Sequence, residues 1–267
     1  KEHLGKVIGA KMAVSFRGFD IGIYPIKNPN CYNLLWTCVD KVHVISDDIL
    51  NLAYDEGMPK NILVEKITPA IDVEFFKPSD HVSIKENRKK INFLTVGRLH
   101  WKKGYEYTLK ALQILKKEGM SFNYIVVGTG IDYEKIAFAA HQLNLLDCVE
   151  FKGKLTQDEI IGLMNNTDIY LQYSIQEGFC NAVLEAQSLR KLCIVSDAEG
   201  LSENIIDGRT GWVVPKRNPE LLASKIDEVL FLTKKEKLKI QNEARKRIKK
   251  EFSIEQQQDK FRNFYIN

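Results

Sequence analysis

Short apolar segments rich in β-branched residues alternate along this chain with stretches whose apolar residues recur at helical spacing. This alternation predicts an α/β protein built on parallel sheet. Unbroken apolar runs such as residues 124–127 indicate strands that are covered on both faces. The predicted strands are Met12–Phe16, Lys41–Ile45, Ile62–Ile67, Asn92–Val96, Tyr124–Val127, Val149–Lys152, Ile169–Gln172, Leu192–Val195 and Gly211–Val214.

Helix boundaries between these strands carry capping signals. Apolar residues recur at helical spacing over residues 105–115, and Gly119 supplies a stop. Three further helix starts are marked by Asn218-Pro219, by Thr233 with Glu236, and by Ser253 with Gln256.

A chain of 267 residues has room for one large domain or two modest ones. The polar stretch at residues 77–88 lacks apolar periodicity and precedes a new strand, which indicates a domain boundary. We therefore predict one domain at residues 1–82, a second at residues 83–251, and a helix at residues 252–267. The first domain has only three strands, so it needs a larger sheet or a partner to pack against.

Composition excludes several classes of protein. Hydrophobic residues make up 44% and charged residues 28%, which are ordinary globular values, and no run of about 18 uncharged apolar residues predicts a membrane span. The five cysteines form no CxxC pair, which favours reduced thiols in a cytoplasmic protein. The net charge of +4 is too small to indicate nucleic acid, and the five histidines lack metal-ligand spacing. The motifs of serine hydrolases and P-loop ATPases are absent.

The first group of candidate site residues lies at residues 97–104, directly between a predicted strand and a predicted helix. Ligands of open α/β sheets bind at the carboxyl ends of strands, where a helix N-terminus offers free amides. Arg98 and Lys103 at such a turn suit a phosphate or diphosphate, and Gly97 lets a ligand approach the backbone closely. The alternative is a solvated basic loop.

The second group, at residues 177–186, follows the strand that ends at Gln172 and leads into a helix. Glu177 lies at the mouth of this helix, and Glu185 lies ~7 Å along its axis. Two carboxylates beside free amides suit a phosphorylated sugar or a nucleotide. The alternative is that Glu177 only caps the helix dipole and that Glu185 is a solvated helix residue.

Two further features have mainly structural interpretations. The turn Gly128-Thr129-Gly130 is predicted to be structural, because a lone GxG is common in strand-to-helix turns, and shaping of the cleft is the alternative. The basic segment at residues 234–250 is a solvated helix face, with contact to anionic lipid headgroups as the alternative.

Taken together, these groups resemble the signature of the retaining glycosyltransferases of family 4, which have the GT-B fold. The residues that carry the resemblance are Gly97-Arg98-Leu99, Lys103-Gly104, Glu177-Gly178-Phe179, Asn181, Leu184-Glu185-Ala186, Ser196-Asp197, Gly200 and Glu203. The resemblance implies an α/β fold of the GT-B type. Its C-terminal nucleotide-sugar domain is Rossmann-like with a parallel sheet, its N-terminal acceptor-side domain is a partial Rossmann-like unit, and its last helix crosses back to the first domain.

The implied activity is metal-independent, cofactor-free transfer of a hexose, with retention, from a nucleotide-diphosphate sugar to a glycan or lipid-linked acceptor. Surface-polysaccharide biosynthesis in the cytoplasm, with the membrane periphery as an option, is the implied setting. The catalytic residues would be Arg98, Lys103 and Glu177. The two cations would bind the diphosphate, and Glu177 would hold the transferred sugar. Donor-binding residues would be Gly97, Gly178, Phe179, Cys180, Asn181, Glu185 on the ribose and Leu155 beside the base, with Arg17 and Asp20 on the acceptor side.

This chain departs from the family pattern in places. Cys180 stands where proline is frequent, and Arg190 and Glu199 stand where glycine is frequent, so the local loop shape differs. The family's acceptor domain is about a hundred residues longer, so we expect a missing segment upstream of Lys1 or a partner chain. Two other functions stay open: a non-catalytic nucleotide-sugar-binding fragment, and another GT-B enzyme such as a phosphorylase or a sugar-nucleotide epimerase. The base, the sugar, the acceptor and the oligomeric state are not predicted.

Overall fold

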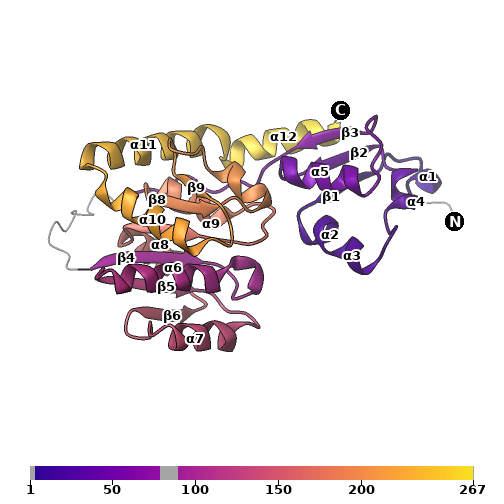
Figure 1. Cartoon of the computed structure of the whole chain (residues 1–267). Coiled ribbons are helices and arrows are strands. Elements are labelled where there is room, and N and C mark those ends of the chain that lie inside the picture. Colours follow the sequence, from indigo (N-terminus) through magenta and orange to yellow (C-terminus); the bar gives the residue numbers. More distant parts are fainter. Residues whose placement is uncertain (1–3, 79–89, 267) are drawn as a thin grey trace.

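A computed structural model describes residues 4–78 and 90–266 and contains two parallel sheets (Figure 1). The smaller sheet has the order β1-β2-β3 and the larger has the order β6-β5-β4-β7-β8-β9. All nine predicted strands are present, with ends within two residues of the prediction. Their bounds are β1 (Ala13–Phe16), β2 (Lys41–Val44), β3 (Leu63–Lys66), β4 (Ile91–Val96), β5 (Phe122–Val127), β6 (Val149–Gly153), β7 (Ile169–Gln172), β8 (Leu192–Ser196) and β9 (Trp212–Val214).

Helices join these strands and cover the sheets. Their bounds are α1 (Leu4–Ile8), α2 (Phe19–Gly22), α3 (Tyr24–Lys27), α4 (Asn33–Trp36), α5 (Asp47–Asp55), α6 (Tyr105–Lys117), α7 (Tyr133–Gln142), α8 (Gln157–Asn165), α9 (Asn181–Ser188), α10 (Pro219–Phe231), α11 (Lys234–Glu251) and α12 (Ile254–Ile266), with short 3-10 helices η1 (Trp101–Lys103) and η2 (Glu199–Asn204). We call the part built on β1–β3 the smaller lobe and the part built on β4–β9 the larger lobe.

The helix boundaries follow the capping signals. Asn218 Oδ1 accepts a hydrogen bond from the Leu221 amide at the start of α10, at 3.0 Å. Thr233 and Glu236 form the predicted reciprocal capping box of α11. Each cap satisfies backbone amides that have no partner within the helix.

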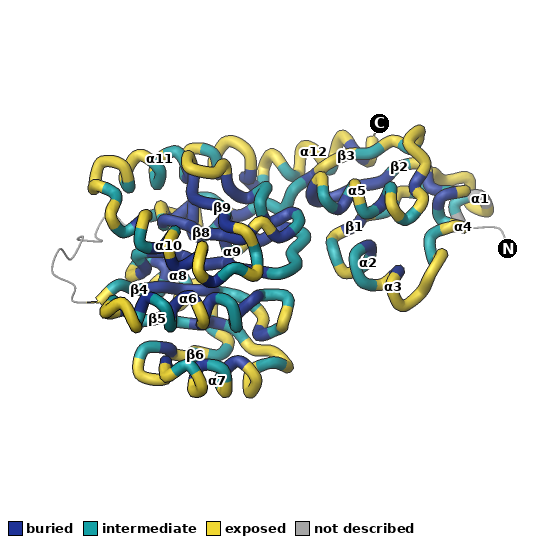
Figure 2. Tube along the Cα trace, in the orientation of Figure 1, coloured by how far each residue is buried: buried dark blue, intermediate teal, exposed yellow. Residues whose placement is uncertain are grey.

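Both faces of the larger sheet are covered. One face packs against α6, α7 and α10. The other packs against α8, α9 and α11, and this apolar cluster continues into the smaller lobe through residues such as Phe16 and Val44. The strands at the centre are therefore mostly buried, and exposed residues lie on the outer faces of the helices and in the loops (Figure 2). This is the arrangement that the unbroken apolar runs predicted.

The chain passes between the lobes twice, and the two passages lie side by side. The Ile71 amide donates to the Phe252 carbonyl at 3.0 Å. Beyond this point α12 lies on the smaller lobe, where the Phe261 and His43 rings are 4.9 Å apart between centroids and Lys41 Nζ donates to the Phe264 carbonyl at 3.0 Å. The predicted boundary between the two domains falls outside the described residues.

Glycines let the two lobes approach closely. A Cβ atom on Gly200 would overlap the Gly178 carbonyl oxygen and would lie 2.7 Å from Ser46 Oγ. A Cβ atom on Gly178 would lie 2.9 Å from the Arg17 carbonyl oxygen. The loop before α9 is therefore packed against the smaller lobe, where a larger residue would force the backbones apart.

The basic helix α11 is held against neighbouring segments by hydrogen bonds from its arginines to backbone carbonyls. Arg247 donates to the carbonyls of Asn204 and Glu203 at 2.8 and 2.9 Å, and Arg245 donates to the Phe76 carbonyl at 3.2 Å.

Within residues 4–78 and 90–266, no helix combines the length and the apolar character that a membrane span needs.

Candidate active site

The two groups of candidate residues meet at one edge of the larger sheet. Strands β4 and β7 are parallel neighbours, so the loops that follow them leave the sheet at the same edge. These loops line a cleft of about 360 Å³. The lining residues are Phe76, Val96, Gly97, Arg98, Lys103, Gln157, Ile160, Phe179, Cys180, Asn181, Ala182 and Glu185. The structure thus brings together seven of the predicted site residues.

A second cavity, of about 70 Å³, adjoins this cleft. Its lining consists of Arg98, His100, Lys102, Lys103, Gln176 and Glu177. Arg98 and Lys103 line both spaces, so these two cations stand between them. We call the larger space the Glu185 cleft and the smaller one the Glu177 cavity.

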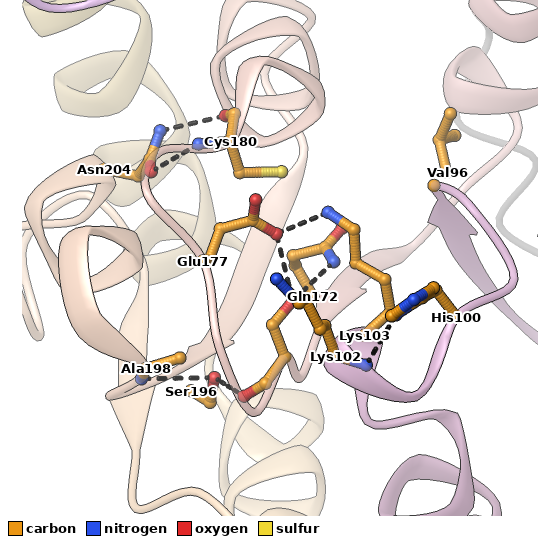
Figure 3. Close-up of polar contacts among 12 residues, drawn as sticks. Val96, His100, Lys102, Lys103, Gln172, Glu177, Cys180, Ser196, Ala198 and Asn204 are labelled. Atoms are coloured by element: carbon orange, nitrogen blue, oxygen red, sulfur yellow. Dashed lines mark hydrogen bonds and ion pairs between the residues drawn. The ribbon is translucent and has the colours of Figure 1, made fainter. Parts of the chain in front are cut away.

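Lys103 and Glu177 form a hydrogen-bonded ion pair between η1 and the loop before α9 (Figure 3). Their side chains are 14% and 15% exposed. Burial favours the neutral amine, but the negative charge of Glu177 and its hydrogen bond to the ammonium group outweigh it, so the pKa of Lys103 is raised. Glu177 is therefore bound to a cation and is more than a cap for the helix dipole.

A chain of hydrogen bonds leads through the protein interior to Glu177. Its members are Tyr170, Gln172 and Ser174, which are fully buried. The Tyr170 hydroxyl donates to Gln172 Oε1 at 3.0 Å, and Gln172 Nε2 donates to Ser174 Oγ at 2.9 Å. Because an amide nitrogen only donates, the Ser174 hydroxyl turns its proton toward Glu177 Oε2, 3.3 Å away. These hydrogen bonds orient the Glu177 carboxylate. The sequence analysis missed it, although Gln172 is a polar residue at the end of an apolar strand.

Neither the Glu185 side chain nor the Arg98 side chain is paired with another charged group among the described residues. The Glu185 carboxyl group lies in the first turns of α9 with no hydrogen-bond partner in the described part of the chain, and burial raises its pKa to about 7. The exposed Arg98 guanidinium likewise has no ion-pair partner within the described part of the chain. A cation and a hydrogen-bond acceptor therefore face the same cleft without internal partners.

Asn204 holds the start of α9, a role that the sequence analysis missed. Its Oδ1 accepts from the Cys180 amide at 3.2 Å, and its Nδ2 donates to the Cys180 carbonyl at 3.0 Å (Figure 3). Cys180 is the N-cap of α9, and its own side chain makes no capping hydrogen bond. Burial raises the pKa of Cys180 to about 11, so it stays a thiol. The amides at this helix end are suited to an anion.

Four predicted site residues lie outside the Glu185 cleft and the Glu177 cavity. Gly178 faces the Arg17 backbone, and Leu155 packs against the core while Gln157 and Ile160 line the cleft instead. The Asp20 carboxylate accepts hydrogen bonds from the amides of its own loop, those of Arg17, Gly18 and Ile21. The Arg17 side chain is exposed.

The glycine turn after β5 has the structural role predicted for it. A Cβ atom on Gly130 would lie 2.6 Å from the Leu99 carbonyl carbon, and one on Gly128 would overlap the Gly97 carbonyl oxygen. These glycines therefore let the turn pack under residues 97–99. In the described residues, no group of three or more His, Cys, Asp or Glu side chains is placed to hold a metal ion.

Several solved structures share the fold of this chain. HepE from Anabaena, in complex with UDP and glucose, superposes with a TM-score of 0.83 at 18% identity, covering 98% of this chain and 73% of that one. A glycosyltransferase from Rickettsia africae gives a TM-score of 0.80 at 23% identity, covering 97% and 71%. The architecture is that of the GT-B glycosyltransferases.

Sequence comparison gives the family. Residues 76–247 match the family model of the glycosyl transferases group 1, and the chain belongs to this family. A putative colanic acid biosynthesis glycosyltransferase of Escherichia coli, WcaL, is 25% identical over 256 residues, which are 92% of this chain and 62% of the relative. The amylovoran biosynthesis glycosyltransferase AmsK of Erwinia amylovora is 31% identical over 140 residues, which are 50% of this chain and 34% of the relative. The chain thus spans less than two thirds of these relatives.

Proposed function

We propose that this protein is a retaining hexosyltransferase of family 4. It moves a hexose from a nucleotide-diphosphate sugar to a glycan or lipid-linked acceptor in surface-polysaccharide biosynthesis. The observation that carries the proposal is the position of Arg98 and Lys103 between the Glu185 cleft and the Glu177 cavity. The solved complex of HepE with UDP and glucose supports a nucleotide-sugar donor, and the colanic acid and amylovoran relatives support the pathway class.

Each end of such a donor has a suitable place in this arrangement. The ribose hydroxyls would donate to the Glu185 carboxylate, and the diphosphate would contact Arg98, Lys103 and the amides at the start of α9. The transferred sugar would lie beside Glu177. Leu155 is proposed as a base neighbour only if residues 153–155 move toward the cleft, and Arg17 with Asp20 marks the acceptor side.

The chemistry follows from charge. As the glycosidic bond breaks, the electron pair moves to the diphosphate oxygen, and Arg98 and Lys103 stabilise the negative charge that grows there. The Lys103–Glu177 ion pair holds the ammonium group in place before the reaction begins, so little reorganisation is needed. These two cations supply the positive charge that a metal ion supplies in other enzymes, which is the basis for proposing a metal-independent reaction.

Incubation of the protein with a panel of UDP-, GDP- and ADP-sugars tests the proposal, with released nucleoside diphosphate measured in the presence of saccharide or lipid-linked acceptors. We expect one donor to be consumed, and we expect Arg98→Ala to lower the rate about 10²- to 10³-fold. Arg209→Ala, at an exposed arginine paired with Glu243, is the matched control and should keep the rate. Full activity in EDTA is expected, whereas activity that depends on an added metal ion would refute the metal-independent reaction.

A further inference from the structure

The Gln176 side chain has a buried oxygen that nothing in the described structure satisfies. Its Oε1 atom is inaccessible to solvent and has no hydrogen-bond partner among the described residues. A buried carbonyl oxygen without a donor is unfavourable, so such atoms in native proteins usually mark a place for a water molecule or a ligand group. Gln176 lines the Glu177 cavity, next in sequence to Glu177.

The position of Gln176 is fixed by its surroundings. The backbone N–H groups of Gln176 and Ile175 both donate to the Lys102 carbonyl, at 3.2 and 2.6 Å. The smaller lobe approaches from the other side, because a Cβ atom on Gly22 of α2 would lie 3.3 Å from Gln176 Nε2. Helix α2 also brings the Phe19 ring to 5.8 Å from Lys102 Nζ. The Glu177 cavity is therefore lined by residues of the larger lobe, and α2 of the smaller lobe lies next to two of them, Gln176 and Lys102.

The order of the two spaces indicates which part of a donor each one takes. A nucleotide sugar is linear, with the diphosphate between the nucleoside and the sugar. Arg98 and Lys103 line both spaces, and Glu185 lines only the larger one. With the diphosphate on the shared cations and the ribose at Glu185, the sugar extends into the Glu177 cavity. This step rests on the function proposed above.

We propose that Gln176 is a sugar-binding residue whose Oε1 accepts a hydrogen bond from a hydroxyl of the transferred sugar. A saccharide suits this cavity because each hydroxyl both donates and accepts. Gln176 Oε1 and the Glu177 carboxylate accept, while Lys102 and Lys103 donate. Gln176 thereby contributes to the choice of sugar, because a site that hydrogen-bonds a substrate hydroxyl discriminates against an analogue that lacks it.

Calorimetric titration separates the sugar contact from nucleotide binding. The wild type is titrated with three pairs: UDP and UDP-glucose, GDP and GDP-mannose, and ADP and ADP-glucose. The pair that binds is then titrated into Gln176→Leu, Gln176→Glu and the control Gln142→Leu at the exposed end of α7. The quantity compared is the ratio of the dissociation constant of the nucleotide sugar to that of the nucleotide. We expect Gln176→Leu to raise this ratio about three- to tenfold with unchanged nucleotide affinity. Gln176→Glu keeps an acceptor oxygen and should raise the ratio less, and Gln142→Leu should not change it.

The outcomes distinguish the two proposals. If the wild type binds the nucleotides and Gln176→Leu keeps the wild-type ratio, the assignment of Gln176 is wrong and the proposed function stands. If the wild type binds none of the three nucleotide pairs, the donor site itself fails and the assignment falls with it. Normal nucleotide binding by Gln176→Leu also shows that the variant is folded.

Discussion

Lys103 and Glu177 are 74 residues apart in sequence and form one ion pair at the wall between the Glu185 cleft and the Glu177 cavity. The pair joins the loops after β4 and β7, which carry the two halves of the sequence signature. Because both side chains are mostly buried, removing one partner leaves the other charge poorly solvated.

Lys103→Met should therefore destabilise the protein and abolish transfer. We expect the free energy of unfolding to fall by about 2 kcal/mol, the scale of a hydrogen bond to a charged group, and the rate to fall at least about 10²-fold. The double variant Lys103→Met with Glu177→Gln should recover part of the stability and none of the activity. Urea denaturation and donor-consumption assays on the two single variants and the double variant check this. Strictly additive stability losses would show that the pair does not interact.

The buried chain under Glu177 predicts a different pattern. Gln172→Leu removes both hydrogen bonds of the Gln172 amide and should lower the free energy of unfolding by about 1–3 kcal/mol. Since Ser174 then no longer directs its proton to Glu177, the maximal rate should fall while the Michaelis constant for the donor changes little. The control is Gln187→Leu, at another fully buried glutamine that bonds to Val183 and Asn204 carbonyls. Equal kinetic losses in both variants would contradict an orienting role.

Glu185 makes stability depend on pH. Its pKa rises from 4.5 to about 7 on folding because of burial. Between these values the folded protein binds more protons than the unfolded chain, so the free energy of unfolding falls as pH rises, by about 3 kcal/mol at most. Glu185→Gln should remove this fall and be the more stable protein at about pH 8. Chemical denaturation at about pH 5 and about pH 8 measures it. Parallel pH dependence in the two proteins would refute the prediction.

The contact between the lobes predicts the effect of a single methyl group. Gly200→Ala places a Cβ atom against the Gly178 carbonyl and Ser46 Oγ, so we expect lower thermal stability and loss of transfer. The control is Gly162→Ala in α8, where the new atom meets nothing within 4 Å. That change should stabilise the protein by up to about 1 kcal/mol, because alanine favours helix. A Gly200→Ala protein as stable and active as the wild type would show that the close packing of Gly200 on the loop before α9 and on Ser46 is not needed.

Local patterns in the sequence predicted the strands and helix starts well, because periodicity and capping depend on neighbouring residues. The edge of the sheet where Arg98 and Glu185 meet followed from the rule for parallel sheets. The ion pair of Lys103 with Glu177, the Asn204 clamp and the chain from Tyr170 to Ser174 were not predicted, since each depends on which strands are neighbours. The strand order β6-β5-β4-β7-β8-β9 decides which strands are neighbours, and local sequence patterns do not predict this order. Asp20 was predicted to face the cleft, but its carboxylate accepts hydrogen bonds from the amides of its own loop, which the residue type alone does not predict.

The central claim is that a nucleoside diphosphate binds across Arg98, Lys103 and Glu185. Calorimetric titration of UDP, GDP and ADP into the wild type, Arg98→Ala, Glu185→Ala and the control Arg209→Ala tests it most directly. The account predicts that the wild type and the control bind one of them at one site, and that each cleft variant binds it at least about tenfold more weakly. Absence of binding to the wild type, or equal affinity in all four proteins, would contradict it.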